Sequence, residues 1–540
     1  MDIRPAATLV LVRDSANGPE VLMLQRTWEA IFMPGFYVFP GGAVDESDTQ
    51  CRDHITGRDD ETVSQIMSLD EGGADFMIAA LRECFEEAGI LLADGHTGDD
   101  YEAERQALNR GEDNFFAFCA RHNLSLPLDR LGYLAHWVTP PGPPRRFDTR
   151  FFVAAMPEGQ SARPDDIETI DHVWLTPQQA LADHESGARL IGPPTARTLR
   201  VLSDFGSAEE VLAYAHANPP EPEPTKAWPG MRKGRPVLVE PGAPAFDELR
   251  KLDPEGKGDA QAEIVPGAAV EVGYGIHRLT APNAGMMTGP GTNTYVLGPQ
   301  APFTVIDPGP DDPAHLEQIL GLTGGQIEQV LVTHTHRDHS PGAMALKTKT
   351  GARLAGMAPP DDASQDHDFR PDYSPEHGEV VSTTAGELKA IHTPGHASNH
   401  LCYLLAGEQM LFSGDHIMQG STVVINPPDG DMRAYLKSLA LLLNEDIRYI
   451  APGHGFLMKD CHRVVDYLIT HRLAREHKVV KALADNGPGT LSELVAHAYE
   501  EVPKALHPLA QRSLLAHLLK LEQDGRARQD EDQCWSLISA

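Results

Sequence analysis

The sequence predicts a multidomain α/β protein, and three observations support this fold class. The chain has 540 residues, which is too long for one hydrophobic core and matches three or so domains of roughly 100–200 residues. Short apolar runs typical of strands alternate with helical patterns in both halves. A segment rich in Pro, Gly and Glu separates these halves. We expect a first domain at 1–216, a linker at 217–262, a second domain at 263–463 and a small helical module at 464–540. An ordered surface segment packed against one domain is the alternative to the linker.

The composition limits the partners of this chain. It carries 45 Lys+Arg against 78 Asp+Glu, and this formal charge of −33 argues against broad binding to nucleic acid or anionic membranes. No apolar run approaches the about 18 residues of a membrane span, and Met1 to Pro5 lack the layout of a secretory signal. The six cysteines are scattered without a C-x-x-C pair, as in reduced proteins. We expect a cytoplasmic protein without membrane contact, whose oligomeric state the sequence leaves open.

The first chemical signature lies on a predicted helix near residue 82. Glu83, Glu86 and Glu87 are spaced so that their carboxylates share one helix face. Three like charges on one face are unfavourable unless a cation neutralises them, and carboxylate oxygens suit Mg²⁺ or Mn²⁺. A solvated acidic helix would be the ordinary interpretation. The full pattern R-E-x-x-E-E-x-G, with Phe-Pro-Gly-Gly upstream at 39–42, favours the metal site instead.

These residues resemble the Nudix hydrolase box, which implies an α/β/α sandwich that cleaves diphosphates linked to another moiety with Mg or Mn. The resemblance implies that Glu86 and Glu87 are metal ligands and that Glu83 is a ligand or contributes to the base. It also implies that Arg82 orients the carboxylates and that the Gly41 carbonyl contributes to the metal site.

The box is interrupted, because 39 residues separate Gly42 from Arg82. Asp48 takes the place of the usual upstream glutamate, and a polar insertion follows at 53–73. Together with Phe-Asp-Thr-Arg-Phe-Phe at 147–152, this interruption resembles the peroxisomal coenzyme A diphosphatase branch, and it leaves substrate and full activity open. Three arginines are candidates for contact with substrate phosphates, and they are Arg145, Arg146 and Arg150. The alternative is that they are ordinary solvated side chains. Glu168 is a candidate fourth acidic ligand or base.

The second signature is His-Thr-His-Arg-Asp-His at 334–339, directly after a predicted strand at 329–333. Imidazole and carboxylate are ligands that zinc prefers, and catalytic zinc lowers the pKa of its bound water to about 7. Three further candidate ligands lie downstream. His396 follows a Pro-Gly turn, and Asp415 and His454 each follow an apolar strand.

This set resembles the metallo-β-lactamase superfamily, an αββα sandwich with a binuclear metal centre. The resemblance implies two zinc ions, one held by His334, His336 and His396. The other would be held by Asp338, His339 and His454, with Asp415 bridging and Asp338 as the candidate catalytic residue.

Within the superfamily, residues 270–540 resemble the β-lactamase-like-protein-2 group. The matching stretches are 289–295, 333–343 and 413–417, followed by two predicted helices and a strand segment that form a winged-helix-like module. Animal members are described as single-strand-preferring endoribonucleases, which makes RNA a possible substrate. The module at 461–540 carries 10 Lys+Arg against 11 Asp+Glu, so charge does not favour RNA. Hydrolysis of a small ester or thioester, as in the glyoxalase-II-like relatives, is the alternative.

The combined expectation is a bifunctional metal-dependent hydrolase that acts on a phosphorylated or thioester small molecule. The competing hypothesis is an RNA-processing endoribonuclease whose Nudix half binds or senses nucleotides.

Overall fold

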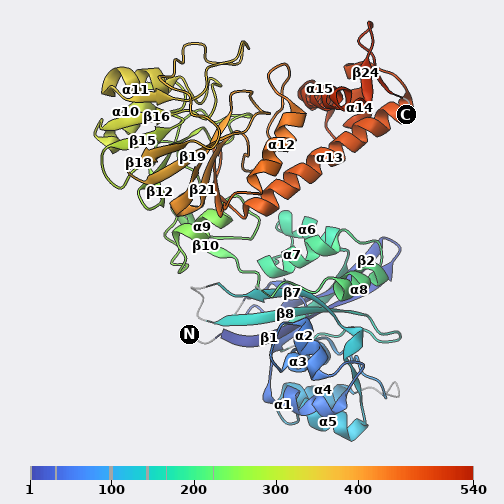
Figure 1. Cartoon of the computed structure of the whole chain (residues 1–540). Coiled ribbons are helices and arrows are strands. Elements are labelled where there is room, and N and C mark those ends of the chain that lie inside the picture. The colour runs from blue at the N-terminus through green and yellow to red at the C-terminus, as the bar shows by residue number, and fades with distance from the viewer. Residues whose placement is uncertain are drawn as a thin grey trace. The chain divides into compact units, whose positions relative to one another are not determined.

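The computed structural model describes residues 3–30, 33–95, 101–140, 145–165, 167–222 and 224–538. The chain divides into two compact units. The first contains Met1–Pro229 and Glu255–Lys257, and the second contains Gly230–Pro254 and Gly258–Ala540 (Figure 1). Within the described residues, no helix is both long enough and apolar enough to cross a membrane.

The first unit is built on one mixed sheet of order β3-β2-β1-β8-β7, with β4 beside β1 and β9 beside β2. Side chains alternate between its faces, so that Leu9 and Leu11 join one core while Val10 and Val12 join the other. The strands are β1 (Ile3–Ser15), β2 (Gly18–Arg26), β3 (Tyr37–Val38), β4 (Gly41–Ala43), β7 (Gly132–Val138), β8 (Arg146–Ala155) and β9 (Thr169–Leu175).

Helices cover both faces of this sheet (Figure 1). On the Leu9 side lie α1 (Glu46–Gln50), α2 (Asp60–Ile66), α3 (Gly73–Ala88), α4 (Glu102–Asn109) and α5 (Phe115–His122), and on the Val10 side lie α6 (Pro177–Glu185), α7 (Pro193–Leu202) and α8 (Ala208–Ala217). The insertion also contains η1 (Cys51–His54) and β5 (Ile55–Thr56), which pairs with β6 (Leu126–Pro127) ahead of η2 (Leu128–Arg130). The unit is therefore the expected α/β/α sandwich.

Helix α3 carries the Nudix-like pattern against this sheet. The apolar face of this helix is buried, with Met77 and Cys84 fully covered. The helix ends at Gly89, whose φ of 69° is left-handed and therefore favours glycine. The Arg105 side chain on α4 donates to the carbonyl oxygens of Glu86 and Glu87. These bonds satisfy carbonyls that a helix C-terminus leaves without an intrahelical partner.

The second unit contains two six-stranded sheets whose facing side chains form a shared core. One sheet has the order β12 (Val270–Gly273), β13 (Ile276–Thr280), β14 (Asn293–Leu297), β15 (Phe303–Ile306), β16 (Ile327–Leu331), β17 (Arg353–Ala355). The other has the order β18 (Val380–Thr383), β19 (Gly386–His392), β20 (Leu401–Leu405), β21 (Met410–Gly414), β22 (Tyr449–Pro452), β23 (Met458–Lys459).

Helices cover the outer faces of these sheets. Helices α10 (Pro313–Thr323) and α11 (Gly342–Thr350) pack on the first sheet, and α12 (Met432–Leu442) and the start of α13 (Cys461–Asn486) pack on the second. A short turn, η3 (Ala406–Glu408), joins β20 to β21. The arrangement is the αββα sandwich expected from the sequence.

The C-terminal module combines the end of α13 with α14 (Leu491–Ala498), η4 (Lys504–Leu506), α15 (His507–Gln523) and the hairpin β24 (Ala527–Gln529) to β25 (Trp535–Leu537). Its core includes Leu483, Leu514 and the fully buried Trp535. Helix α13 belongs to both parts, because Val465 packs on the sandwich while Val479 packs in the module.

The domain boundaries drawn from the sequence stay predictions. Within the segment 217–262, the structure contains β10 (Trp228–Arg232), β11 (Arg235–Val239) and α9 (Phe246–Leu252). Helix α9 belongs to the second unit, and its Glu248 side chain is buried there beside Arg278 on β13.

Candidate metal centres

The candidate zinc ligands follow the ends of neighbouring strands in the second unit. His334, His336, Asp338 and His339 come after β16, which ends two residues earlier than the expected strand. Asp415 comes directly after β21, and His454 follows β22, which pairs in parallel with β21. His396 lies in the loop after β19. Because β16 belongs to one sheet and β19, β21 and β22 belong to the other, strand ends from two facing sheets supply these side chains.

Three imidazoles converge in the first group. The Nε2 atom of His334 lies 2.9 Å from Nδ1 of His336, and Nε2 of His396 lies 3.0 Å from the same Nδ1 atom. All three ligand atoms lie within 4.8 Å of one another. This geometry can hold one cation.

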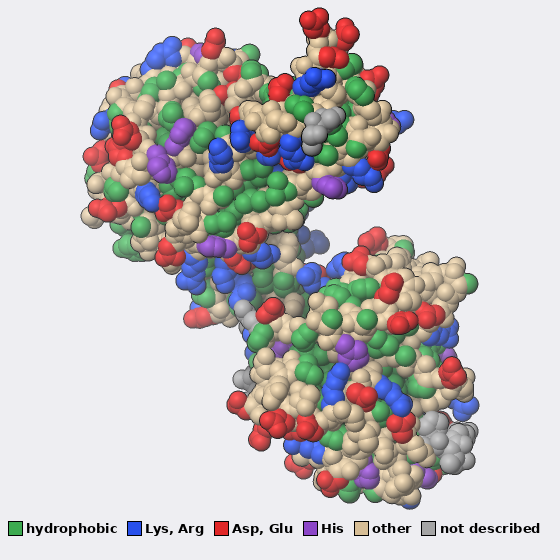
Figure 2. Space-filling view, turned by 45° about the vertical axis from the view of Figure 1, so that its right-hand side comes forward, with side chains coloured by type: hydrophobic (Ala, Val, Ile, Leu, Met, Phe, Trp, Pro, Cys, Tyr) green, Lys and Arg blue, Asp and Glu red, His purple; other side chains and the backbone are tan. Residues whose placement is uncertain are grey.

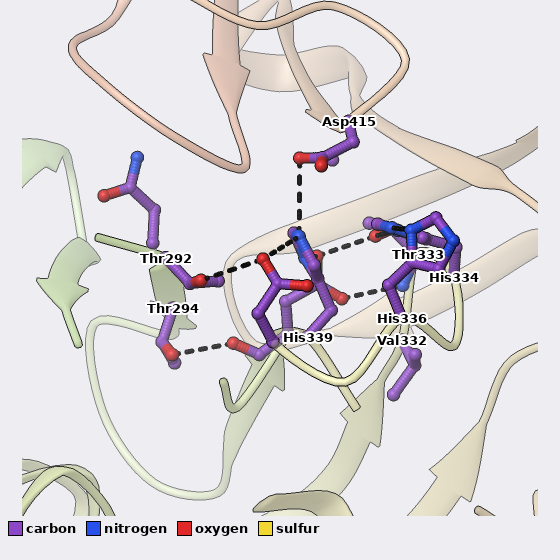
Figure 3. A network of polar contacts seen from close by, with 12 residues as sticks. Thr292, Thr294, Val332, Thr333, His334, His336, His339 and Asp415 are labelled. Carbon is purple, nitrogen blue, oxygen red and sulfur yellow. Dashed lines mark hydrogen bonds and ion pairs between the residues drawn. The ribbon is translucent and has the colours of Figure 1, made fainter. Parts of the chain in front are cut away.

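The second group contains Asp338, His339 and His454, whose ligand atoms also lie within 4.8 Å of one another. The Nε2 atom of His454 is 3.3 Å from the Asp338 carboxylate. Asp415 lies between the groups, because its Oδ1 is 3.2 Å from His454 and 3.3 Å from His339 (Figure 3), while its Oδ2 is 3.7 Å from His396. The structure thus brings all seven sequence-predicted residues together.

The second nitrogen of several imidazoles is held by the protein. Nδ1 of His396 lies 2.7 Å from the Val424 carbonyl oxygen, and Nδ1 of His454 lies 3.1 Å from the Gly291 carbonyl oxygen. A carbonyl can only accept, so each Nδ1 carries the proton. When the ring is neutral, each Nε2 then presents its lone pair toward the centre, as a metal ligand must.

Asp307 organises the loop beneath the cluster. Its carboxylate accepts from the backbone N–H and the hydroxyl of Thr333, both at 2.7 Å, and lies 2.9 Å from Nδ1 of His339. Because the Thr333 hydroxyl donates to Asp307, it accepts from Nδ1–H of His334 at 3.0 Å. One carboxylate thus fixes the orientation of two imidazoles.

Charge within the cluster follows burial and proximity. Burial lowers the pKa of His334 well below its ordinary value and that of His336 to about 3, so both rings are neutral. Burial opposes protonation of His454 as well, but the Asp415 carboxylate raises its pKa to about 9. Burial would raise the pKa of Asp415, but the imidazoles of His454 and His339 hold it well below the usual range. The ionised Asp415 carboxylate therefore stabilises a positive charge beside it.

Unsatisfied atoms test whether this cluster fits a metal. Nε2 of His339, Nε2 of His454 and Oδ1 of Asp415 are buried without a hydrogen-bond partner. Buried polar atoms are rarely left in this state, and all three face the centre of the cluster. The donor set of imidazole and carboxylate fits zinc or a similar divalent cation.

Further histidines surround the cluster. The ring of His400 stacks on His334 with centroids 5.0 Å apart, and its Nδ1 lies 2.9 Å from the Thr393 hydroxyl. His416 is fully buried, and the centroid of its ring lies 5.9 Å from that of the His400 ring. Nε2 of His392 lies 3.0 Å from the Ser398 carbonyl oxygen. None of these three belongs to the convergent groups among the described residues.

The Nudix-like residues of the first unit gather around Arg82. This buried guanidinium donates two bonds to Asp48, at 2.8 and 3.1 Å, one to Glu83 at 2.8 Å and one to Glu86 at 3.0 Å. It also donates to the Ala43 carbonyl oxygen at 2.8 Å. Asp48 thus holds Arg82 even though the insertion separates them in sequence, and Arg82 aligns two of the three glutamates.

Glu87 is held separately by the glycine loop. The Gly41 N–H donates to its carboxylate at 2.9 Å. A Cβ at Gly42 would lie 2.4 Å from the Glu83 carboxylate, so a larger residue there would have to displace this carboxylate.

The three glutamates resist ionisation. Burial raises the pKa of Glu83 to about 7 and raises that of Glu86, in both cases against the opposing charge of Arg82. Burial, followed by the charge of Glu83, raises the pKa of Glu87 well above its usual range. A divalent cation would relieve this repulsion, so the donor set fits Mg²⁺ or Mn²⁺.

The remaining candidates of the first unit are dispersed. The glutamates do not form a group with all ligand atoms within 4.8 Å among the described residues. Arg150 is buried, lies 4.1 Å from the Phe76 ring and donates to Asp148, whereas Arg145 is exposed and Arg146 donates to the Thr139 carbonyl oxygen. The exposed Glu168 lies 3.9 Å from Arg26.

Sequence reasoning missed the supporting groups. The Thr292 hydroxyl donates to Asp338 at 3.4 Å (Figure 3), although the stretch containing Thr292 was recognised. The carbonyls of Gly291 and Val424 carry no side-chain signal, because any residue has a carbonyl oxygen.

Comparisons with known proteins address each domain. Residues 287–454 match a family model described as the Metallo-beta-lactamase superfamily. Residues 490–535 match the Beta-lactamase associated winged helix domain, and residues 52–202 match the NUDT19 Nudix domain. The multidomain fold class and the hydrolase class expected from the sequence are confirmed.

Individual relatives cover the second unit. The chain is 31% identical over 291 residues to the Beta-lactamase-like protein 2 homolog of Drosophila melanogaster, covering 49% of this chain and 93% of that protein. It is 31% identical over 257 residues to the Atrochrysone carboxyl ACP thioesterase of Aspergillus chevalieri, covering 44% of this chain and 79% of that protein.

The first unit has a relative among solved structures. The NUDIX hydrolase from Alicyclobacillus acidocaldarius is 32% identical with a TM-score of 0.35, covering 39% of this chain and 96% of that chain. The protein is a hydrolase that belongs to the metallo-beta-lactamase superfamily and joins this domain to a NUDT19 Nudix domain and a beta-lactamase associated winged helix domain.

Proposed function

We propose that this chain is a bifunctional metal-dependent hydrolase, with a binuclear zinc centre in the second unit and a Mg²⁺ or Mn²⁺ centre in the first. The observation that carries the zinc proposal is the convergence of seven ligand side chains in groups linked by Asp415. His334, His336 and His396 would hold one zinc, and Asp338, His339 and His454 the other.

Two bound zinc ions would supply a hydroxide nucleophile and polarise the bond under attack. The residues of this chain orient that chemistry. Asp307 and the Gly291 carbonyl hold the imidazoles so that their lone pairs face inward. Thr292 donates to Asp338, the proposed catalytic carboxylate, and thereby restricts its rotation.

In the first unit, Glu86 and Glu87 would hold the divalent cation, with the Gly41 carbonyl contributing, and Glu83 would act as ligand or base. Its pKa of about 7 suits proton transfer near neutral pH. Arg82 would keep Glu83 and Glu86 in register. The proposed substrate is a diphosphate in a nucleotide-linked or coenzyme A-like molecule.

A thioester is the favoured substrate class of the zinc site. Support comes from similarity to proteins named as carboxyl ACP thioesterases, at 30–31% identity. RNA cleavage is the competing candidate, and it rests on the similarity to the Beta-lactamase-like protein 2 homolog. The near-equal charges of residues 461–540 weigh against it, because a phosphate backbone needs a positive surface.

Metal analysis tests the centre first. Wild type should bind about two zinc ions per chain in the binuclear arrangement, and His334→Ala should lose zinc. His392→Ala is the matched control, because His392 is outside the convergent groups of the described residues and its Nε2 lies against the Ser398 carbonyl oxygen. Wild type without bound transition metal but with full activity would refute the zinc centre.

Substrate assays then separate the candidates. Wild type, Asp338→Ala and Glu86→Gln are incubated with an acyl-coenzyme A and with single-stranded RNA. We expect Asp338→Ala to abolish thioester cleavage alone and Glu86→Gln to abolish Mg²⁺-dependent diphosphate cleavage alone. RNA cleavage removed by Asp338→Ala, without thioester cleavage in wild type, would favour the competing candidate.

A further inference from the structure

A polar cavity of about 380 Å³ opens in the second unit, apart from the residues of the zinc cluster. Helix α9, the turn η3 and the start of β22 contribute its wall. The lining residues are Arg250, Lys251, Pro254, Gly407, Glu408, Gln409, Arg448 and Tyr449. Its volume lies in the lower part of the range of roughly 300–1,000 Å³ for small-molecule sites.

Cations dominate the lining. Three basic side chains stand against one carboxylate, in a chain whose formal charge is −33. The Lys251 ammonium lies 4.6 Å from the centroid of the Tyr449 ring, and the Arg448 guanidinium lies 5.5 Å from the same centroid. Figure 2 shows Lys and Arg side chains gathered at the lower end of the second unit in that view. Both cations thus lie against the ring of one tyrosine.

The charges of Lys251 and Arg448 are only weakly paired with carboxylates of the protein. Glu408 is 3.8 Å from Lys251, which is longer than a hydrogen bond. Over the parts of the chain that the structure describes, no carboxylate forms an ion pair with Arg448. Burial lowers the pKa of Lys251, with Glu408 opposing and the charge of Arg448 adding to the effect. Like charges repel, and an anion bound in the cavity would offset this repulsion.

The cavity wall is held in place by bonds outside it. Glu248 and Asp247, on the same helix as Lys251, accept from the backbone N–H groups of Leu457 and Lys459 at 2.8 and 3.1 Å. The Gln409 carbonyl accepts from the N–H groups of Arg448 and Tyr449. The cations are therefore presented on anchored backbone, which reduces the entropy lost when a ligand binds.

We propose that this cavity binds the phosphate group of a small molecule through Lys251 and Arg448, with Arg250 at its edge. Phosphate suits the site because ammonium and guanidinium donors both recognise its oxygens. The polar lining and the cavity size favour a small anion over an apolar ligand or a nucleic-acid chain. The proposal is independent of the function assigned to either metal centre.

Titration calorimetry with inorganic phosphate tests the proposal on the full chain. Lys251→Gln and Arg448→Gln should each weaken phosphate binding about tenfold, the value expected for losing one charge-assisted hydrogen bond. Glu408→Gln should strengthen binding about threefold, because it removes the only carboxylate from the cavity lining. Lys437→Gln, at an exposed position on α12 outside the cavity, is the charge-matched control and should bind as wild type does.

Phosphate can also bind at the metal centres, so every variant is compared at equal metal content. Any phosphate held by the metals is then common to all variants. The Glu408→Gln variant guards against misfolding, since a damaged protein would not gain affinity. Equal affinity in wild type, Arg448→Gln and Glu408→Gln would overturn the proposal.

Discussion

Glu248 and Arg278 form a buried bidentate ion pair, with nitrogen–oxygen distances of 2.5 and 2.9 Å. The pair joins α9 to β13, and the same Glu248 carboxylate accepts from the N–H of Leu457, three residues after His454. Burial would lower the pKa of Arg278, but the charge of Glu248 raises it. Helix α9, which lies in the Pro-rich segment, is therefore tied both to β13 and to the stretch that follows the candidate ligand His454.

Removing one partner of this pair should destabilise the second unit. Glu248→Ala leaves the Arg278 charge buried without its partner, which costs about 3–5 kcal/mol. Thermal unfolding should show a lower Tm for Glu248→Ala than for Glu328→Ala, a matched change at an exposed position on β16. Equal Tm values for the two variants would contradict the structural role of the pair.

Asp307 should control metal affinity without being a ligand. Asp307→Asn keeps the shape but removes the charge that faces Nδ1 of His339. Groups that orient metal ligands typically change affinity about 10–100-fold when mutated, so zinc should be lost at lower chelator concentration. Chelator competition measures this shift, and Asp311→Asn, an exposed residue nearby in sequence, serves as control. Unchanged zinc retention in Asp307→Asn would contradict the prediction.

Asp48 should support diphosphate cleavage across the insertion. Asp48→Asn weakens the two bonds that hold Arg82, and Arg82 then loses its alignment of Glu83 and Glu86. We expect diphosphate hydrolysis to fall about 10–100-fold while zinc-dependent hydrolysis stays at the wild-type rate. The exposed Asp53→Asn should leave both rates unchanged. A loss of both activities in Asp48→Asn would indicate general misfolding instead.

His517 should make the C-terminal module sensitive to acid. Burial, with the charges of Arg472 and Lys520, lowers its pKa from 6.5 to about 3. The unfolded chain binds a proton below about pH 6.5 and the folded chain does not, so stability falls as the pH drops from 6.5 toward 3.

Substitution by leucine should reduce that sensitivity, because both ring nitrogens of His517 lack hydrogen-bond partners. The Tm difference between pH 7 and pH 5 should be smaller for His517→Leu than for wild type. His497→Leu, at an exposed position on α14, should leave the difference unchanged. The same Tm difference in His517→Leu and wild type would show that His517 is not the source of the acid sensitivity.

Much of the zinc site could be predicted because ligands at strand ends follow one another in recognisable short stretches. His334 to His339 form one continuous cluster, and the Pro-Gly turns before His396 and His454 mark the others. The helical spacing of Glu83, Glu86 and Glu87 likewise predicted a shared face, and the Nudix resemblance implied that Arg82 orients the carboxylates. Neither indicated that the Gly41 N–H holds Glu87.

The supporting contacts could not be predicted in the same way. Asp48 and Arg82 are 34 residues apart, and Glu248 and Leu457 are 209 apart, so no local pattern relates them. The composition of 217–262 indicated a linker, because Pro and Gly interrupt its periodicity, and it gave no sign that Glu248 would be buried.

The sequence by itself determined the residue types, the order of the domains and the position of each ligand at the end of a strand or on one helix face. These features depend on spacing within a few residues, which the strand and helix repeats impose. Only the tertiary structure decided which nitrogen of each histidine faces inward, which charge Arg278 meets, and that Lys251 and Arg448 share one tyrosine ring. Those outcomes depend on burial and distance between remote segments, and both arise only when the sheets pack.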